Sequence, residues 1–364
     1  MTTIFSTQSA VDPKSQTDWN PSQNLNPAYP SADETMTDCV QDLKLFGYSE
    51  TEARFLRLVA LHSGVFLARQ FNLFARAKTG YRVDAFVKKL KSNCHCHTYR
   101  LGKNVAMFHL HSKAIYRAIG HENLRHRRSH QAGYVKTKLL TLDFVLQNPT
   151  LRYFPTEEEK VELFTTVLNV PLSDLPVKAY MTPNSKTETR RYFVDKHPLF
   201  LSDVSSPRPV VHFSYVDAGR HTTRADFLNH LRSYGPLFSR MPVIRMVYIY
   251  ECSSKWKWAE QQFTNFVRSG LEVRNSDLDL VKYFQLREAW ELKQYERVGS
   301  TELLFLNHAR KKYTGAQYNE LYSDWKRGDR TRPGPKSNGR DNVAEGVFTT
   351  YKIADQYGMF GELD

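Results

Sequence analysis

The chain has 364 residues, 41% of them hydrophobic, which is enough for two domains with cores of their own. Four cysteines do not make a disulfide framework in a chain this long, and no run of about 18 apolar residues suggests a transmembrane helix. The N-terminus lacks the apolar stretch of a secretory signal, so we expect a cytoplasmic protein without a membrane partner.

The formal net charge of +13 is unevenly distributed along the chain. Residues 1–38 hold one Lys or Arg and five Asp or Glu, whereas residues 39–150 hold 19 and six, and residues 151–364 hold 31 and 27. Eight of the 13 histidines also lie in 39–150. A basic field concentrated in one segment attracts polyanions, which favours nucleic acid as a partner.

Residues 1–38 are rich in Ser, Thr, Asn, Gln and Pro, which predicts a disordered N-terminal arm that could dock on a partner protein. Residues 39–150 then predict a winged helix-turn-helix with a bridging helix. Its first helix begins at a capping box, Ser49 to Glu52, and ends at Ser63-Gly64.

A second helix is expected over 67–76 and a third over 82–91. A hairpin follows, with strands at 97–101 and 105–111 around Gly102-Lys103-Asn104. This order is typical of a domain that places its third helix in the major groove of DNA and its hairpin on the backbone.

The residues expected to contact double-stranded DNA lie on the third helix, on the hairpin and in the basic segment 121–130: Arg82, Lys88, Lys89, Lys91, Arg100, Lys103, Arg125, Arg127 and Arg128. The alternative is a small helical domain with a solvated basic face, or a basic segment that contacts acidic residues of another subunit. A homodimer on two half-sites is compatible with this geometry, although no dimer motif is visible.

Four potential metal ligands flank the hairpin turn. A turn centred on 102–103 pairs residue 96 with 109 and residue 94 with 111, which puts Cys94, Cys96, His109 and His111 on one sheet face as a possible zinc set. The spacing is not that of a standard finger, and ligands on one strand suit a tetrahedron poorly. We therefore expect no metal and no other cofactor.

Residues 135–146 form a strongly apolar helix, expected as a bridge to the next domain or as a dimer seam. A second capping box, Thr156 to Glu159, opens a helix to about 168. Strands are then expected at 177–181, 191–201, 210–217, 243–250 and 271–273, with helices at 222–241 and 253–270. Segments 151–275 thus predict an α/β sandwich whose last strands are parallel.

Residues 276–325 predict C-terminal helices, and residues 326–364 a basic Pro/Gly linker followed by an aromatic tail that docks rather than staying free. This tail is a second candidate for contact with a protein partner. We therefore expect an α+β or α/β chain: an N-terminal winged helix-turn-helix, a nuclease-like sandwich and C-terminal helices.

A metal-dependent nuclease of the PD-(D/E)xK type needs an acidic residue on one strand and an acid-x-Lys on the next. Here Asp195 and Asp217 occupy the matching strands, but Tyr215 stands where a carboxylate belongs and no lysine follows at the required place. We therefore expect an inactive scaffold, with a Mg²⁺-dependent nuclease using Asp195 and Asp217 as the alternative. Tyr215 could also be the nucleophile of a strand-transfer reaction, as in a relaxase. The sequence around it, however, does not supply the histidine cluster that binds the metal ion of a relaxase.

Three segments of this region carry a resemblance: Phe213-Ser214-Tyr215-Val216-Asp217, Leu231-Arg232-Ser233-Tyr234 and residues 243–250. Residues 45 to 270 resemble the replication-relaxation family of plasmids and other bacterial mobile elements, although Tyr215 departs from its pattern. The resemblance implies a winged helix joined to a degraded nuclease-like domain. It predicts a DNA-binding, non-enzymatic transcriptional regulator or replication or transfer accessory; a protein-interaction module is the other alternative.

Overall fold

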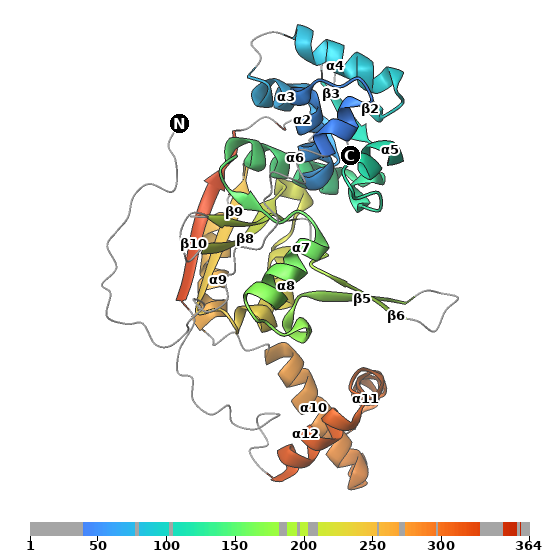
Figure 1. The fold of residues 1–364 in the computed structure, drawn as a ribbon. Coiled ribbons are helices and arrows are strands. Elements are labelled where there is room, and N and C mark those ends of the chain that lie inside the picture. The colour runs from blue at the N-terminus through green and yellow to red at the C-terminus, as the bar shows by residue number, and fades with distance from the viewer. Residues whose placement is uncertain are drawn as a thin grey trace. The chain divides into compact units, whose positions relative to one another are not determined.

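The computed structural model describes a mixed α+β protein over residues 39–76, 80–101, 105–181, 188–194, 197–202, 210–252, 255–268, 274–295, 298–327, 345–354 and 357. Contacts divide the chain into two compact units (Figure 1). The first comprises Met1–Leu172, Lys196–His212 and Tyr357–Asp364, and the second Ser173–Asp195 and Phe213–Gln356. The chain therefore leaves and re-enters each unit, unlike the contiguous segments predicted from the sequence.

The first unit contains the predicted three helices and hairpin. These are α2 (Glu50–His62), α3 (Ala68–Phe74), α4 (Tyr81–Ser92), β2 (Cys96–Arg100) and β3 (Ala106–Leu110). A short strand that the sequence did not predict, β1 (Val65–Leu67), pairs with β3 and completes an antiparallel sheet of order β1-β3-β2. Three residues directly before a helix give too short a pattern for a strand prediction.

The start and the end of helix α2 are set by the capping box and the glycine that the sequence predicted. The Ser49 hydroxyl accepts the amide of Glu52, and the Glu52 carboxylate accepts the amide of Ser49, so the capping box is complete. Gly64 ends the helix with φ of +76°, and its amide donates to the Val59 carbonyl over 2.7 Å. Aromatic rings then join the elements: Phe71 stacks on Phe86 with ring centroids 4.4 Å apart.

After α5 (Lys113–Ala118) and a 3₁₀ turn (Arg125–Arg127), helix α6 (Ala132–Gln147) is buried on nearly every side. It packs against β1, α3 and α2. Its apolar residues are thus buried in the single folded chain, and the predicted dimer seam is not needed to bury them. Strands β4 (Arg152–Tyr153) and β7 (Leu199–Ser202) pair antiparallel, and helix α7 (Glu157–Glu162) starts at the predicted capping box.

The second unit contains an antiparallel pair, β5 (Val177–Met181) and β6 (Glu188–Tyr192), and most of β8 (Val210–Asp217). Residues 191–201 were expected as one strand; the structure has β6 and β7 instead. Phe193 takes a φ of +47°, which an extended strand does not allow, and Pro198 offers no amide for a ladder.

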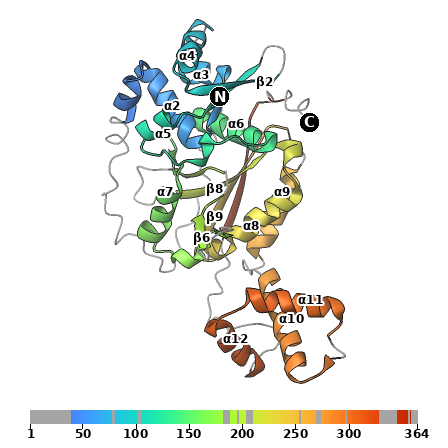
Figure 2. The same ribbon diagram turned by 90° about the vertical axis from the view of Figure 1, so that its right-hand side faces the viewer.

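Helix α8 (Arg224–Phe238), strand β9 (Val243–Tyr250) and helix α9 (Trp256–Arg268) follow as predicted. The tail supplies β10 (Glu345–Lys352), which runs parallel to β9 with Glu345 opposite Val243 and Lys352 opposite Tyr250. Helix α9 packs on β10 and on α8 (Figure 2). The predicted strand 271–273 lies outside the described residues.

Three helices, α10 (Arg274–Glu291), α11 (Ser300–Lys312) and α12 (Ala316–Arg327), confirm the predicted C-terminal helical region. They share an aromatic core in which the Phe284 ring lies 5.3 Å from that of Tyr322 and 5.7 Å from that of Trp325. Among the described residues, no helix is long and apolar enough to span a bilayer.

Candidate nucleic-acid interface

The side chains of helix α4 fall into a buried group and an exposed group, as the periodicity of a helix predicts. Val83, Phe86 and Leu90 are buried against the core, whereas Arg82 and Lys88 are exposed. Lys91 is also exposed, and Tyr81, the first residue of the helix, is 81% exposed. Tyr81 was not among the predicted contacts, although its position outside the apolar stripe was visible in the sequence.

Lys89 has a different role from its neighbour Lys88. Its ammonium lies 2.7 Å from the Glu52 carboxylate, the same oxygen that caps α2. The pair joins the start of α2 to the end of α4. Lys89 was predicted to contact DNA; in the structure its side chain is directed to Glu52.

The β2–β3 hairpin carries Arg100 at the end of β2, exposed to solvent. Beside it, Tyr99 is 41% exposed and was also missed in the sequence. Lys103, predicted at the hairpin tip, lies outside the described residues. The hairpin therefore presents one cation and one aromatic ring at its described end.

A hairpin side chain forms a hydrogen bond with the backbone of the basic segment after α5. The imidazole Nε2 of His109, on β3, lies 3.0 Å from the His126 carbonyl oxygen. Arg128 is exposed, whereas Arg125 and Arg127 are half-buried, and the buried Nε of Arg127 has no hydrogen-bond partner in the described part of the chain. Of the three predicted contacts in this segment, Arg128 is the most accessible.

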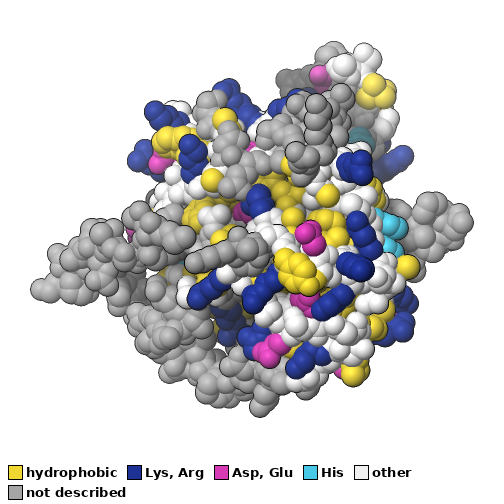
Figure 3. All heavy atoms as spheres, turned by 90° about the horizontal axis from the view of Figure 1, so that it is seen from above, with side chains coloured by type: hydrophobic (Ala, Val, Ile, Leu, Met, Phe, Trp, Pro, Cys, Tyr) yellow, Lys and Arg dark blue, Asp and Glu magenta, His cyan; other side chains and the backbone are white. Residues whose placement is uncertain are grey.

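The surface agrees with the charge distribution of the sequence. Figure 3 shows one face of the molecule, on which Lys and Arg side chains clearly outnumber Asp and Glu side chains. A surface of this kind concentrates polyanions by long-range attraction, which is weakened by salt.

The hairpin register does not bring together the four residues of the possible zinc set. Cys96 pairs with Leu110 and His97 pairs with His109, one residue away from the expected pairing. Because neighbouring strand residues point to opposite faces, Cys96 lies on the core face, where burial raises the pKa of its thiol to about 11. His97 stacks on His111 with centroids 3.7 Å apart. The described residues contain no cluster of three metal-ligating groups.

In the second unit, the Asp217 carboxylate at the end of β8 is 1% exposed. It accepts hydrogen bonds from the Gly219 amide at 2.9 Å, from the Tyr248 hydroxyl at 2.7 Å and from the Thr222 hydroxyl. The Lys255 ammonium lies 3.7 Å away. These donors already hydrogen-bond to the carboxylate, and the second unit holds it in a fixed position.

Tyr215 is buried between Tyr248, on which it stacks at 5.7 Å, and Phe227, which it meets edge-on at 5.0 Å. Burial and the nearby Asp217 carboxylate raise the pKa of its hydroxyl well above the ordinary value. A phenol in this environment is a poor nucleophile. Asp195, the other predicted nuclease residue, lies outside the described residues.

Comparison with known proteins finds no matching family model, no similar curated protein and no similar solved structure. The resemblance to the replication-relaxation family therefore rests on the sequence segments given above.

Proposed function

We propose that the first unit is a winged helix-turn-helix that binds duplex DNA, and that the chain acts as a regulator or as a replication or transfer accessory of a bacterial mobile element. The observation that carries this proposal is that three cations of α4, Arg82, Lys88 and Lys91, are exposed around the part of the helix outside its apolar stripe, where Asp84 is the exposed acid. This function would place the protein in the cytoplasm.

The arrangement suits groove binding for a physical reason. A helix enters the major groove with one face, and its flanking cations contact phosphates on either side. Tyr81 at the start of α4 can pack against a sugar or a base edge, and Arg100 at the end of β2 can contact the adjacent backbone. The second unit then serves as a nuclease-like scaffold without catalytic function, as the engaged carboxylate of Asp217 suggests.

The test is binding of labelled duplex DNA, measured by fluorescence anisotropy at several salt concentrations. Replacing both Lys88 and Lys91 with Ala should weaken binding at least tenfold and lower the salt slope by about 0.9 for each phosphate that the variant no longer neutralises. Lys311→Ala, which removes an exposed charge from α11, is the matched control and should leave affinity and slope unchanged. If Lys311→Ala weakened binding as much as the double replacement of Lys88 and Lys91, the protein would bind DNA only by general charge attraction, and α4 would not be the DNA-binding site.

The competing nuclease is tested with the same protein and plasmid DNA in the presence of Mg²⁺. We expect binding without cleavage. Cleavage that is abolished in Asp217→Asn would overturn the assignment of a non-catalytic second unit and leave the DNA-binding assignment of α4 standing.

A further inference from the structure

The exposed side of helix α4 carries a row of four side chains, one of which is acidic. The members recur at intervals of three or four residues: Tyr81, Asp84, Lys88 and Lys91. They therefore lie along one face of the helix, opposite its buried apolar stripe, and all four are exposed. The two lysines attract phosphates, whereas the carboxylate repels them. A carboxylate in this row lowers the affinity for DNA unless it makes a favourable contact of its own.

Asp84 is not engaged in an ion pair within the described part of the chain. At the start of α2, Glu50 pairs with the cation four residues later, Arg54, at 2.7 Å. Lys88 stands in the same position relative to Asp84, but neither of these two side chains forms an ion pair with a described residue. Because the carboxylate of Asp84 is also exposed, it can accept a hydrogen bond from a ligand at the surface.

The surface beside Asp84 is hollowed. A groove of about 640 Å³ extends along α4 and is bounded on its other side by Phe46 and Gly47. Ala85 and Ser92 also line the groove, and both have small side chains. Small side chains on this face allow a base edge to come close to the helix. A close approach is necessary here, because the side chain of aspartate is short.

We propose that Asp84 identifies one base pair of the bound DNA by accepting a hydrogen bond from the exocyclic amino group of cytosine in the major groove. This inference rests on the DNA-binding function proposed above. Cytosine and adenine are the bases that present an amino donor in the major groove, whereas guanine and thymine present acceptors. Adenine places the acceptor N7 beside its amino group, which repels a carboxylate. Cytosine presents the donor alone, so it is the base that Asp84 selects.

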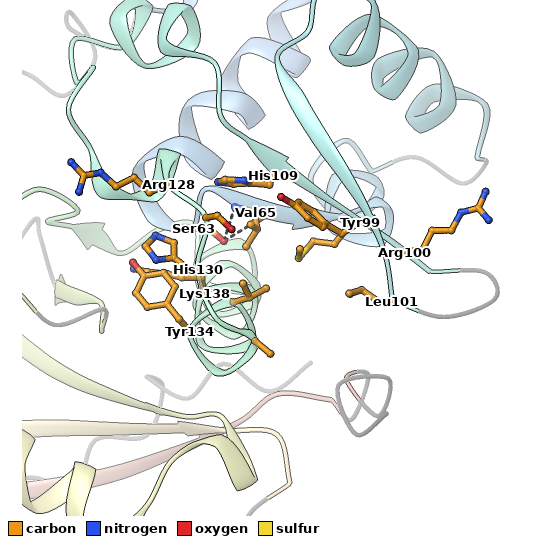
Figure 4. Close-up of a pocket in the computed structure, with 14 residues that line it drawn as sticks. Ser63, Val65, Tyr99, Arg100, Leu101, His109, Arg128, His130, Tyr134 and Lys138 are labelled. Atoms are coloured by element: carbon orange, nitrogen blue, oxygen red, sulfur yellow. Dashed lines mark hydrogen bonds between the residues drawn. The ribbon is translucent and has the colours of Figure 1, made fainter. Parts of the chain in front are cut away.

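The neighbouring cations have a different part in this interface. Figure 4 shows the guanidinium groups of Arg100 and Arg128 pointing away from the pocket between the β2–β3 hairpin and α6, and both side chains are exposed. Cations of this kind contact phosphates, which fixes the position of the protein on the duplex but does not distinguish one base from another. Asp84 therefore supplies sequence specificity that these residues do not provide.

The first experiment is selection from a pool of duplexes with a randomised central segment, carried out with the full chain and with Asp84→Asn. We expect the unaltered protein to enrich a motif with a C·G pair at one constant position. Asparagine pairs with the N6 and N7 atoms of adenine, so Asp84→Asn should enrich an A·T pair at that position and leave the rest of the motif unchanged.

Two kinds of failure are distinguishable in this selection. A motif without a constant C·G pair, or a motif that Asp84→Asn leaves unaltered, would overturn the role of Asp84, although the enrichment itself would support DNA binding. A pool from which the unaltered protein retains no duplex would overturn the proposed function, and the role of Asp84 with it.

The second experiment compares affinities by fluorescence anisotropy for the selected site and for a duplex of A·T pairs in mixed order. Asp84→Ala should weaken binding to the selected site at least about fivefold, the equivalent of one base contact. The same change should strengthen binding to the A·T duplex, because the repulsion between the carboxylate and phosphates is removed. Changes of the same sign and size for both duplexes would mean that Asp84 acts only through its charge, which would overturn the inference.

A control variant separates base recognition from net charge. Glu320→Gln removes one exposed negative charge from α12, and it should leave both affinities and the selected motif unchanged. An acid in the first turn also stabilises a helix, and Asp84 is in the first turn of α4. Melting curves of the Asp84 variants measure this contribution separately and identify the variants that fold.

Discussion

At the scale of single residues, Glu52 connects two helices through one carboxylate. Its Oε2 atom accepts the Ser49 amide at 2.7 Å and lies 2.7 Å from the Lys89 ammonium. The side chain is largely buried, whereas that of Lys89 is 40% exposed. Different substitutions can therefore remove the ion pair alone or the ion pair together with the helix cap, so the two contributions to stability can be measured separately.

We predict that Glu52→Ala lowers the free energy of unfolding by about 1–2 kcal/mol, because both the cap and the pair are removed. Glu52→Gln keeps an acceptor for the cap and should cost less than about 1 kcal/mol, as should Lys89→Ala. Urea unfolding measures all three. A cost for Lys89→Ala equal to that of Glu52→Ala would mean that the cap contributes nothing.

His62 is a second residue with a measurable consequence. Burial, together with Lys138, Arg57 and Lys160, lowers the pKa of its imidazole from 6.5 to about 3. The ring meets Tyr153 edge-on at 5.3 Å. The folded protein therefore keeps this imidazole neutral at pH values at which the unfolded chain is protonated.

Because unfolding then takes up about one proton at His62, stability should fall as the pH decreases from 7 toward 5. His62→Gln should make the fall in melting temperature smaller. His308→Gln, at an exposed position on α11, serves as the control and should leave the pH dependence as it was. An unchanged pH dependence in His62→Gln would show that the imidazole has the same pKa in the folded and the unfolded state.

At the scale of elements, Gly64 is the point where α2, the small sheet and the basic segment meet. Its φ is +76°, its carbonyl accepts the Leu110 amide at 2.8 Å, and an added Cβ would collide with the backbone carbonyl of His126. Here the left-handed conformation and the close approach both require glycine.

Gly64→Ala should therefore cost about 2 kcal/mol or more, since strain and a backbone clash add together. Gly47 has a similar φ of +83° but open space around an added Cβ, so Gly47→Ala should cost only about 1 kcal/mol. Chemical denaturation of the two variants gives the comparison. Equal costs would assign the effect to the backbone conformation alone.

At the scale of the whole molecule, Tyr357, which is far from the rest of the first unit in the sequence, contributes a buried hydrogen bond to that unit. The Tyr357 hydroxyl donates to the buried Asp143 carboxylate, which also receives both terminal nitrogens of Arg69, at 2.8 and 2.7 Å. Gln70 donates to the same carboxylate at 2.8 Å. The Arg69 guanidinium lies 4.8 Å from the centroid of the Tyr357 ring.

We predict that Tyr357→Phe destabilises the first unit by about 1–2 kcal/mol, because a buried charged acceptor is deprived of one donor. Tyr116→Phe is the matched control: the Tyr116 hydroxyl is buried in the same unit and has no hydrogen-bond partner among the described residues, so its removal should cost almost nothing. Thermal unfolding distinguishes the two. Equal melting temperatures would mean that Tyr357 contributes only its ring.

The sequence by itself determined the features that depend on neighbours within a few positions. The capping boxes at Ser49 and Thr156, the end of α2 at Gly64 and the stripe of Val83, Phe86 and Leu90 are set by contacts three or four residues apart. The concentration of positive charge in residues 39–150 is likewise a property of the sequence alone. These signals predicted most of the helices and the hairpin.

Only the tertiary structure decided which of these residues meet. The direction of Lys89 to Glu52, the burial of α6, the pairing of β10 with β9 and the contact of Tyr357 with Asp143 join positions that are far apart in the chain. A shift of one residue in the hairpin register separated Cys96 from His109. Local periodicity carries no information about such contacts, because long-range packing and strand register fix them.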